Sequence, residues 1–193
     1  MRYPVTGTRT SGVCAGVCTG FALETLPISS WAISTSNDGI EVDKDVKIKT
    51  GKEIMPAFMA MPKGKGPYPV IIVIHEIFGV HEYIQDVCRR LAKEGYLAIS
   101  PSLYFRQGDA TQLKSIDEIR SKILSKLSIE QVLRDLDASV DWLRQNKSAN
   151  TSKLGMTGFC WGGTITWLYS AHSKALDAGV AWYGRLSGDK GPN

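Results

Sequence analysis

The chain has 193 residues, of which 43% are hydrophobic and 22% are charged, and its formal net charge is +4. This composition and length are those of a globular protein with one sizeable core. The basic residues are scattered, so no nucleic-acid-binding stripe is indicated. No apolar run reaches the roughly 18 residues that a membrane-spanning helix needs.

The cysteine and histidine content argues against a metal site or a disulfide framework. The four cysteines (Cys14, Cys18, Cys88 and Cys160) include no C-x-x-C pair, and only three histidines are present. A zinc site and a set of disulfides are therefore not expected. The sequence also lacks a phosphate-cradling loop and a nucleotide-binding fingerprint, so we predict no cofactor.

The first 42 residues are rich in Gly, Ser and Thr and show little periodicity. A broken apolar region, Val13 to Ser34, follows Arg2 and Arg9, which is the order typical of an export signal. Glu24 interrupts that region and argues against a clean signal. Two interpretations stay open: a signal remnant in an exported protein, or a poorly ordered extension of a cytoplasmic one.

Predicted elements begin near Asp43. Alternating residues at 45–49 and 54–61 predict two strands joined as a hairpin. The continuously apolar run 70–75 predicts a central parallel strand covered on both faces. Further along, the pattern predicts helices at 81–94, 115–127, 129–145 and 164–171, and strands at 96–100, 153–157 and 178–183. This alternation predicts one α/β domain over residues 43–193 with a mainly parallel sheet.

Residues 158–162, Gly-Phe-Cys-Trp-Gly, lie between a predicted strand and a predicted helix. They match the nucleophile-elbow pattern, with Cys160 in place of serine. The turn needs glycines because a Cβ at either flanking position would crowd the crossing of strand and helix. N–H groups at the start of the helix favour a thiolate and stabilise negative charge that develops nearby. The alternative is a buried structural cysteine beside a glycine turn.

Four stretches together resemble the dienelactone hydrolases, which are α/β-hydrolases with a cysteine nucleophile. They are residues 75–79 (His-Glu-Ile-Phe-Gly), 101–106 (Pro-Ser-Leu-Tyr-Phe-Arg), 158–163 (Gly-Phe-Cys-Trp-Gly-Gly) and 181–184 (Ala-Trp-Tyr-Gly). The resemblance covers roughly residues 43–190, and the combination is more specific than any single motif. It implies an α/β-hydrolase fold with helices on both faces of the central sheet.

The resemblance implies catalytic roles for four residues. Cys160 is the nucleophile, and Glu76 matches the glutamate that contacts the thiol and helps to form the thiolate. The backbone N–H groups of Trp161 and Ile77 look like the oxyanion hole. From the residues alone, Glu76 is also a common kind of loop carboxylate, although it lies at the strand edge where ligands bind in open α/β sheets.

The resemblance also implies a substrate pocket. Arg106 matches the arginine that holds a substrate carboxylate, a task suited to a planar guanidinium. Tyr104 and Tyr183 would line the pocket. The alternatives are a solvated loop charge for Arg106 and ordinary packing roles for the two tyrosines.

The sequence offers no histidine for the catalytic triad of this family. α/β-Hydrolases place nucleophile, acid and histidine in that order along the chain, and after Tyr183 this sequence has Asp189 but no histidine. We interpret His75, His81 and His172 as structural. The expected consequence is slow deacylation. The sequence is then either a fragment of a longer protein or a naturally shortened one. In both cases we expect the last predicted strand to be an exposed edge of the sheet.

The leading hypothesis is a hydrolase that cleaves a small ester or lactone, with a substrate carboxylate if Arg106 acts as a clamp. Two alternatives stay open. One is a non-catalytic α/β protein that keeps a reactive thiol, and the other is a carboxylesterase of broad specificity. The sequence indicates no nucleic-acid partner and leaves the oligomeric state open.

Overall fold

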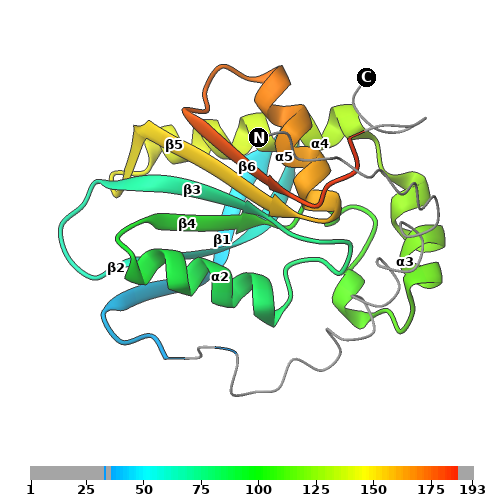
Figure 1. Ribbon diagram of the computed structural model, residues 1–193, viewed down its shortest axis with the longest axis horizontal. Coiled ribbons are helices and arrows are strands. Elements are labelled where there is room, and N and C mark those ends of the chain that lie inside the picture. Colours follow the sequence, from blue (N-terminus) through cyan, green and yellow to red (C-terminus); the bar gives the residue numbers. More distant parts are fainter. Residues whose placement is uncertain (1–32, 34–35, 187–193) are drawn as a thin grey trace, which may run out of the picture. The chain divides into compact units, whose positions relative to one another are not determined.

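The computed structural model describes residue 33 and residues 36–186, so the possible export signal, Cys14, Cys18 and Asp189 lie outside the described part (Figure 1). Six strands form one sheet in the order β1-β2-β4-β3-β5-β6. The elements are β1 (Ile40–Thr50), β2 (Glu53–Pro62), β3 (Tyr68–Ile74), α2 (Glu82–Lys93), β4 (Leu97–Pro101), η2 (Ala110–Gln112), α3 (Ile116–Lys122), η3 (Leu124–Lys126), α4 (Ile129–Gln145), β5 (Ala149–Phe159), α5 (Trp161–His172) and β6 (Ala178–Trp182).

The predicted hairpin and the predicted parallel strands are both confirmed. β2 runs antiparallel to β1 and to β4. β4, β3, β5 and β6 are mutually parallel neighbours. The carboxyl ends of these four strands therefore meet at one edge of the sheet, where ligands bind in open α/β folds.

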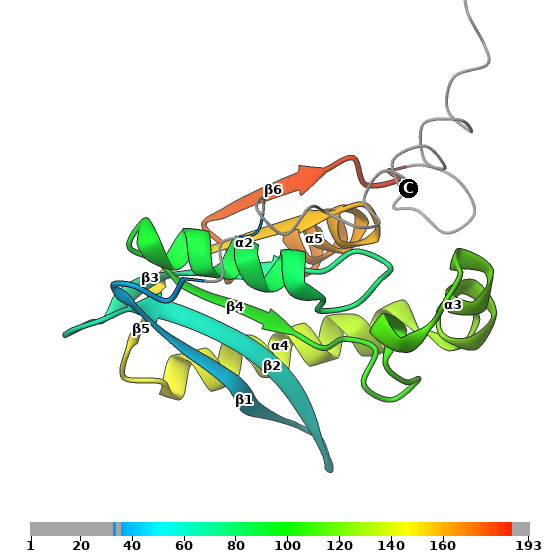
Figure 2. The same ribbon diagram turned by 90° about the horizontal axis from the view of Figure 1, so that it is seen from below.

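Helices cover both faces of the sheet, which separates two apolar cores (Figure 2). α2 packs on one face through Ile84, Cys88 and Ala92, which contact Phe58 and Val73. α4 and α5 pack on the other face. Their side of the core includes Val132, Leu136, Val140, Ile165 and Tyr169, together with inward residues of β1 to β5. Strands covered on both faces need apolar side chains on both, which is why β3 is continuously apolar.

Several element boundaries differ from the sequence pattern; β5, for example, begins at Ala149 rather than at residue 153. β1 starts at Ile40 rather than near Asp43, because Ile40 is buried and pairs with Pro62. The helix predicted over 115–127 divides into α3 and the short η3. Two serines explain the break, since Ser121 and Ser125 each donate a hydroxyl hydrogen bond to a carbonyl four residues earlier, a contact that bends helices.

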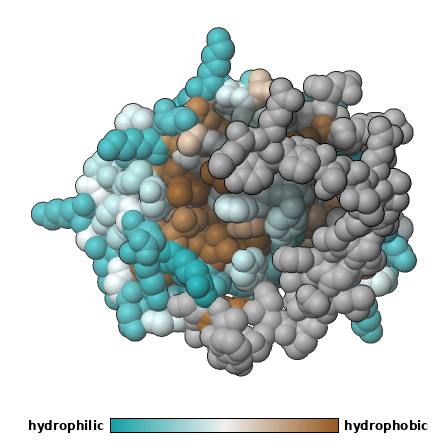
Figure 3. All heavy atoms as spheres, viewed as in Figure 1, coloured by the Kyte–Doolittle hydropathy of each residue, from teal (hydrophilic) through white to brown (hydrophobic). Residues whose placement is uncertain are grey.

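β6 is the last strand of the sheet in the part of the chain that the structure describes. Its side chains Val180 and Trp182 are 48% and 50% exposed. Trp182 stacks on Phe159, which also contacts Tyr83 of α2, so this apolar surface lies on the α2 side of the sheet. Figure 3 shows apolar side chains reaching the surface near the middle of this face.

A charge on the exposed face of β6 should reduce any pairing between copies of the chain through that surface. An apolar edge strand is a template for pairing with another chain, and a lysine there opposes it. We expect Val180→Lys to weaken self-association at least about tenfold, as loss of a buried valine contact would. Light scattering over a concentration series measures this. Ile54→Lys is the control, because Ile54 is 52% exposed but lies on the internal strand β2. Equal effects of the two variants would contradict the prediction.

Candidate active site

Cys160 lies at the tight turn between β5 and α5. Its φ of 55° is in the left-handed region, which residues other than glycine rarely adopt. The backbone is held there from both sides: Cys160 N–H donates to the Trp182 carbonyl at 3.0 Å, and the Cys160 carbonyl accepts from Gly163 and Thr164. A strained residue so firmly held at the carboxyl edge of a parallel sheet is typical of a functional position.

Three glycines make this turn possible because backbone passes close to each. A Cβ on Gly158 would lie 2.2 Å from the Gly162 carbonyl oxygen, and one on Gly162 would lie 2.4 Å from the Ile74 carbonyl oxygen. A Cβ on Gly163 would lie 2.5 Å from the Trp182 carbonyl oxygen. The helix start thus packs directly against the ends of β3 and β6. The expectation that the elbow needs small residues is met by these distances.

Glu76 follows β3 and is buried, with both carboxylate oxygens in contact with neighbours. Tyr183 donates its hydroxyl to Oε1 at 2.8 Å, and His81 Nε2 lies 3.2 Å from Oε2. Burial by itself raises the pKa of this carboxyl, but the hydrogen bonds from His81 and Tyr183 outweigh it and leave the pKa below its usual value. Glu76 is therefore ionised at neutral pH, and its contacts with Tyr183 and His81 fix the position of its carboxylate.

His75, Tyr104 and Trp161 form an aromatic cluster beside the elbow. The ring centroids of His75 and Tyr104 lie 4.6 Å apart, and those of Tyr104 and Trp161 lie 4.8 Å apart. Burial raises the pKa of Tyr104 well above its usual value, and the charge of nearby Cys160 raises it further. His75 and Tyr104 also line a cavity of about 510 Å³, open along the ends of β3 and β4.

His75 is a neutral imidazole in the folded chain. Burial lowers its pKa from 6.5 to about 4, although a hydrogen bond to the Glu76 carbonyl opposes the shift. That carbonyl can only accept, so Nδ1, at 2.7 Å, carries the proton. Nε2 is then the unprotonated nitrogen, and within the described residues it has no hydrogen-bond partner.

The free energy of unfolding should therefore decrease as the pH is lowered from 6.5 to 4. In this window the unfolded chain binds a proton on His75 that the folded chain does not, so acid favours unfolding. From the two pKa values, the loss between pH 7 and pH 5 is about 2 kcal/mol. Urea unfolding of wild type and His75→Asn at both pH values measures it, since asparagine retains a short donor and does not titrate. An equal pH dependence in the two proteins would contradict the prediction.

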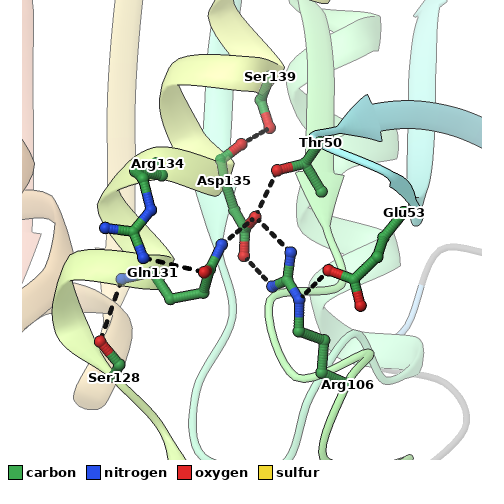
Figure 4. Close-up of polar contacts among 8 residues, drawn as sticks. All are labelled: Thr50, Glu53, Arg106, Ser128, Gln131, Arg134, Asp135 and Ser139. Carbon is green, nitrogen blue, oxygen red and sulfur yellow. Dashed lines mark hydrogen bonds and ion pairs between the residues drawn. The ribbon is translucent and has the colours of Figure 1, made fainter.

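Arg106 is paired with two acidic residues of the chain. Its Nη1 and Nη2 donate to the two carboxylate oxygens of Asp135 on α4, at 2.6 and 3.0 Å, and its Nε donates to Glu53 at 2.5 Å. Figure 4 shows the guanidinium between these two acids. Of the other predicted residues, Glu76 and Tyr183 are hydrogen-bonded, Tyr104 and Trp161 are in ring contact, and Ile77 follows Glu76 in the loop after β3.

Sequence reasoning missed His81 and Asp135 as partners of predicted site residues. His81 precedes α2 and gave no signal beyond its position five residues after Glu76. Asp135 did carry a signal: it lies between Val132 and Leu136 on the buried side of α4, where a carboxylate requires a partner. His172 pairs with Asp137, 3.0 Å away, on the far part of α5.

The described residues contain no cluster of three or more His, Cys, Asp or Glu side chains able to hold a metal ion. Among the helices of residues 36–186, none is long and apolar enough to cross a membrane.

Comparison with known proteins identifies a family. The family described as "Dienelactone hydrolase family" matches residues 55–192. A protein of Methylorubrum extorquens named "Putative carboxymethylenebutenolidase" is 50% identical over 182 residues, which cover 94% of this chain and 62% of that protein. A protein of the same name from Escherichia coli K12 is 50% identical over 175 residues, covering 90% of this chain and 64% of that protein.

A solved structure agrees with these matches. The crystal structure described as "Putative Dienelactone Hydrolase" from Klebsiella pneumoniae superposes with a TM-score of 0.75 at 50% identity, over 80% of this chain and 64% of that one. The predicted α/β-hydrolase fold is thereby confirmed. The chain spans somewhat less than two thirds of the length of these relatives.

Proposed function

Because the chain belongs to the dienelactone hydrolase family, we propose that it cleaves a small ester or lactone through Cys160 and an acyl-enzyme. The observation that supports this most is the elbow, where Cys160 has a φ of 55° directly before Trp161, the first residue of α5. The first N–H groups of a helix lack intrahelical partners and carry partial positive charge. The sulfur therefore lies beside donors suited to an oxyanion.

The proposed reaction has two steps. The thiolate of Cys160 adds to the carbonyl carbon, and the oxygen takes the negative charge beside the N–H groups of Trp161 and Ile77. Collapse of this intermediate breaks the ester C–O bond, the alkoxide takes up a proton, and a thioester remains on Cys160. Water then attacks the thioester and releases the acid.

Glu76 is the proposed proton acceptor for the thiol. While Tyr183 and His81 contact its two oxygens, its pKa is low and it is a weak base. A substrate that displaces the Tyr183 hydroxyl would remove one of these hydrogen bonds. The pKa of Glu76 would then rise toward that of the thiol, and proton transfer would become more favourable as substrate arrives.

Deacylation needs a base that activates water, and the three histidines of the sequence are each held by a contact with another group. His75 is buried and donates to the Glu76 carbonyl, and His172 lies beside Asp137 on the far part of α5. His81 contacts Glu76 itself. We therefore expect an acyl-enzyme to form and to hydrolyse slowly. This favours a second candidate function, capture of an acyl group by a reactive thiol without rapid turnover.

Burst kinetics with p-nitrophenyl acetate test the proposal. We expect wild type to release about one equivalent of p-nitrophenolate rapidly, followed by a slow steady rate. Cys160→Ala should show no burst. Cys88→Ala is the matched control and should retain it, because burial raises the pKa of the Cys88 thiol and leaves it protonated. A burst that survives in Cys160→Ala would exclude Cys160 as the nucleophile, and the steady rate separates turnover from capture.

The expectation of a substrate carboxylate rested on Arg106. Since that guanidinium already contacts two acids of the chain, the proposal concerns the ester or lactone group itself.

A further inference from the structure

His75 follows the last residue of β3 and is completely buried. Two contacts connect its ring to the two chain segments that carry the proposed oxyanion donors. Its Nδ1–H donates to the Glu76 carbonyl at 2.7 Å, directly before Ile77. The ring also stacks on the indole of Trp161, with the centroids 5.4 Å apart and the planes inclined by 21°. One side chain therefore contacts the loop after β3 and the start of α5.

The hydrogen bond to the Glu76 carbonyl determines where the Ile77 N–H points. The two groups belong to one peptide unit, which is planar and trans, so the C=O and N–H bonds point in opposite directions. Fixing the carbonyl on His75 thus directs the N–H away from it. The Gly79 N–H also donates to this carbonyl, at 3.3 Å, and the contact with His75 is the shorter of the two.

The contact with Trp161 fixes the second donor. Trp161 is the first residue of α5, and the first N–H groups of a helix have no intrahelical partner. The backbone of His75 also meets this helix turn, because a Cβ on Gly162 would lie 2.5 Å from the His75 carbonyl oxygen. His75 therefore packs against the start of α5 with its ring and with its backbone.

Both N–H groups are available to a ligand. Within the described residues, neither the Ile77 N–H nor the Trp161 N–H donates a hydrogen bond to another group of the protein. Most backbone N–H groups in folded proteins are paired. An oxyanion that develops during the reaction would supply the acceptor that these two donors lack.

Folding stability alone does not explain an imidazole at this position. Within the described residues, Nε2 of His75 is buried without a hydrogen-bond partner, and such an atom destabilises the folded state. An apolar side chain would fill the space without that cost. It would lack the Nδ1–H that the Glu76 carbonyl accepts.

We infer that His75 is a positioning residue for the oxyanion hole: its Nδ1–H directs the Ile77 N–H, and its ring holds the start of α5, where Trp161 carries the second N–H. This inference rests on the proposed function of Cys160 and deepens it. His75 acts through the two donors rather than on the substrate itself. Its loss should therefore slow only those reactions of Cys160 in which negative charge develops on a carbonyl oxygen.

Two reactions of the same sulfur test the inference. Acylation by p-nitrophenyl acetate passes through an oxyanion, whereas alkylation by iodoacetamide displaces iodide and develops no charge on the carbonyl oxygen. The second-order rate constant of acylation is taken from the burst, and that of alkylation from mass spectrometry of the Cys160 peptide. Because both reactions need the thiolate, the ratio of the two constants reports on the oxyanion hole alone.

His75→Leu and His75→Asn are a matched pair of nearly equal shape, and only asparagine has an N–H that can replace Nδ1–H. We expect His75→Leu to slow acylation at least about tenfold and alkylation less than about twofold, since losing one oxyanion donor outright costs roughly 10²–10³ in rate. His75→Asn should keep the ratio within about threefold of wild type, because the donor is retained. His172→Leu, on the far part of α5, is the control and should change neither reaction.

Equal slowing of both reactions in His75→Leu would show a merely structural role and overturn the inference. Equal ratios in His75→Leu and His75→Asn would overturn it as well, and both results leave Cys160 as the nucleophile. If His75→Leu does not fold, His75→Phe takes its place, because it keeps a ring against Trp161 and lacks the donor. The absence of a burst in wild type, with Cys160 still alkylated by iodoacetamide, would instead overturn the proposed function.

Discussion

Gly158→Ala is expected to destabilise the fold by about 4 kcal/mol or more, because overpacking against fixed backbone is one of the few mechanisms that produce so large an effect. The added Cβ would lie 2.2 Å from the Gly162 carbonyl oxygen and 2.6 Å from the Thr166 hydroxyl. The carbonyl belongs to the first turn of α5 and accepts a hydrogen bond from Thr166, so it cannot simply rotate away. The start of α5 would have to shift, and with it the Trp161 N–H beside Cys160.

Two measurements check this prediction: the free energy of unfolding in urea, and the burst with p-nitrophenyl acetate. Gly155→Ala is the matched control on the same strand, because the nearest atom to its added Cβ is 3.7 Å away. This control should alter stability by less than about 1 kcal/mol and retain the burst. If Gly158→Ala behaves like Gly155→Ala, the close packing of the elbow is not what holds Cys160 in place.

Asp135→Asn is expected to lower the free energy of unfolding by about 3 kcal/mol, the size found when one partner of a buried ion pair is removed. Asp135 accepts hydrogen bonds from Arg106, Thr50 and Gln131 and is almost fully buried. An asparagine of the same shape has one carbonyl oxygen and no charge. It therefore leaves Arg106 without its main counter-ion and places an amide N–H₂ against donors.

Asp141→Asn provides the comparison on the same helix. Asp141 pairs with Arg144 at the surface, with 65% of its side chain exposed, and such pairs contribute roughly 0.2–1 kcal/mol. A double-mutant cycle between Asp135→Asn and Arg106→Gln then isolates the coupling, which should be a large part of the loss. Equal effects of Asp135→Asn and Asp141→Asn would show that the cluster around Arg106 does not stabilise the fold.

The fold was predictable because each of its main strands and helices has a hydrophobic pattern that a few neighbouring residues define. The alternation in β1 and β2, the continuously apolar β3 and the amphipathic α4 each follow from a few neighbouring residues. α4 was placed at its observed bounds, Ile129–Gln145. The elbow was equally local, since Gly158 and Gly162 flank Cys160 directly. The break between α3 and η3 was missed because it depends on serine hydroxyls that compete with the helix.

Contacts between distant residues were the part that sequence reasoning could not supply. Glu76 and Tyr183 are 107 residues apart, and their hydrogen bond exists only because β3 and β6 end at the same sheet edge. Arg106 shows the limit more sharply. Its motif indicated a substrate clamp, but its partner Asp135 is 29 positions away on α4. A motif fixes a residue type at a place in the chain and does not fix what the side chain contacts.

The most direct test of the account is to locate the acyl group after reaction. Wild type is mixed with p-nitrophenyl acetate, quenched in acid, digested and examined by peptide mass spectrometry. We expect one acetyl group as a thioester on Cys160, removable by hydroxylamine, and no acetyl group on Cys88. An acetyl group on another residue, with Cys160 unmodified, would contradict it.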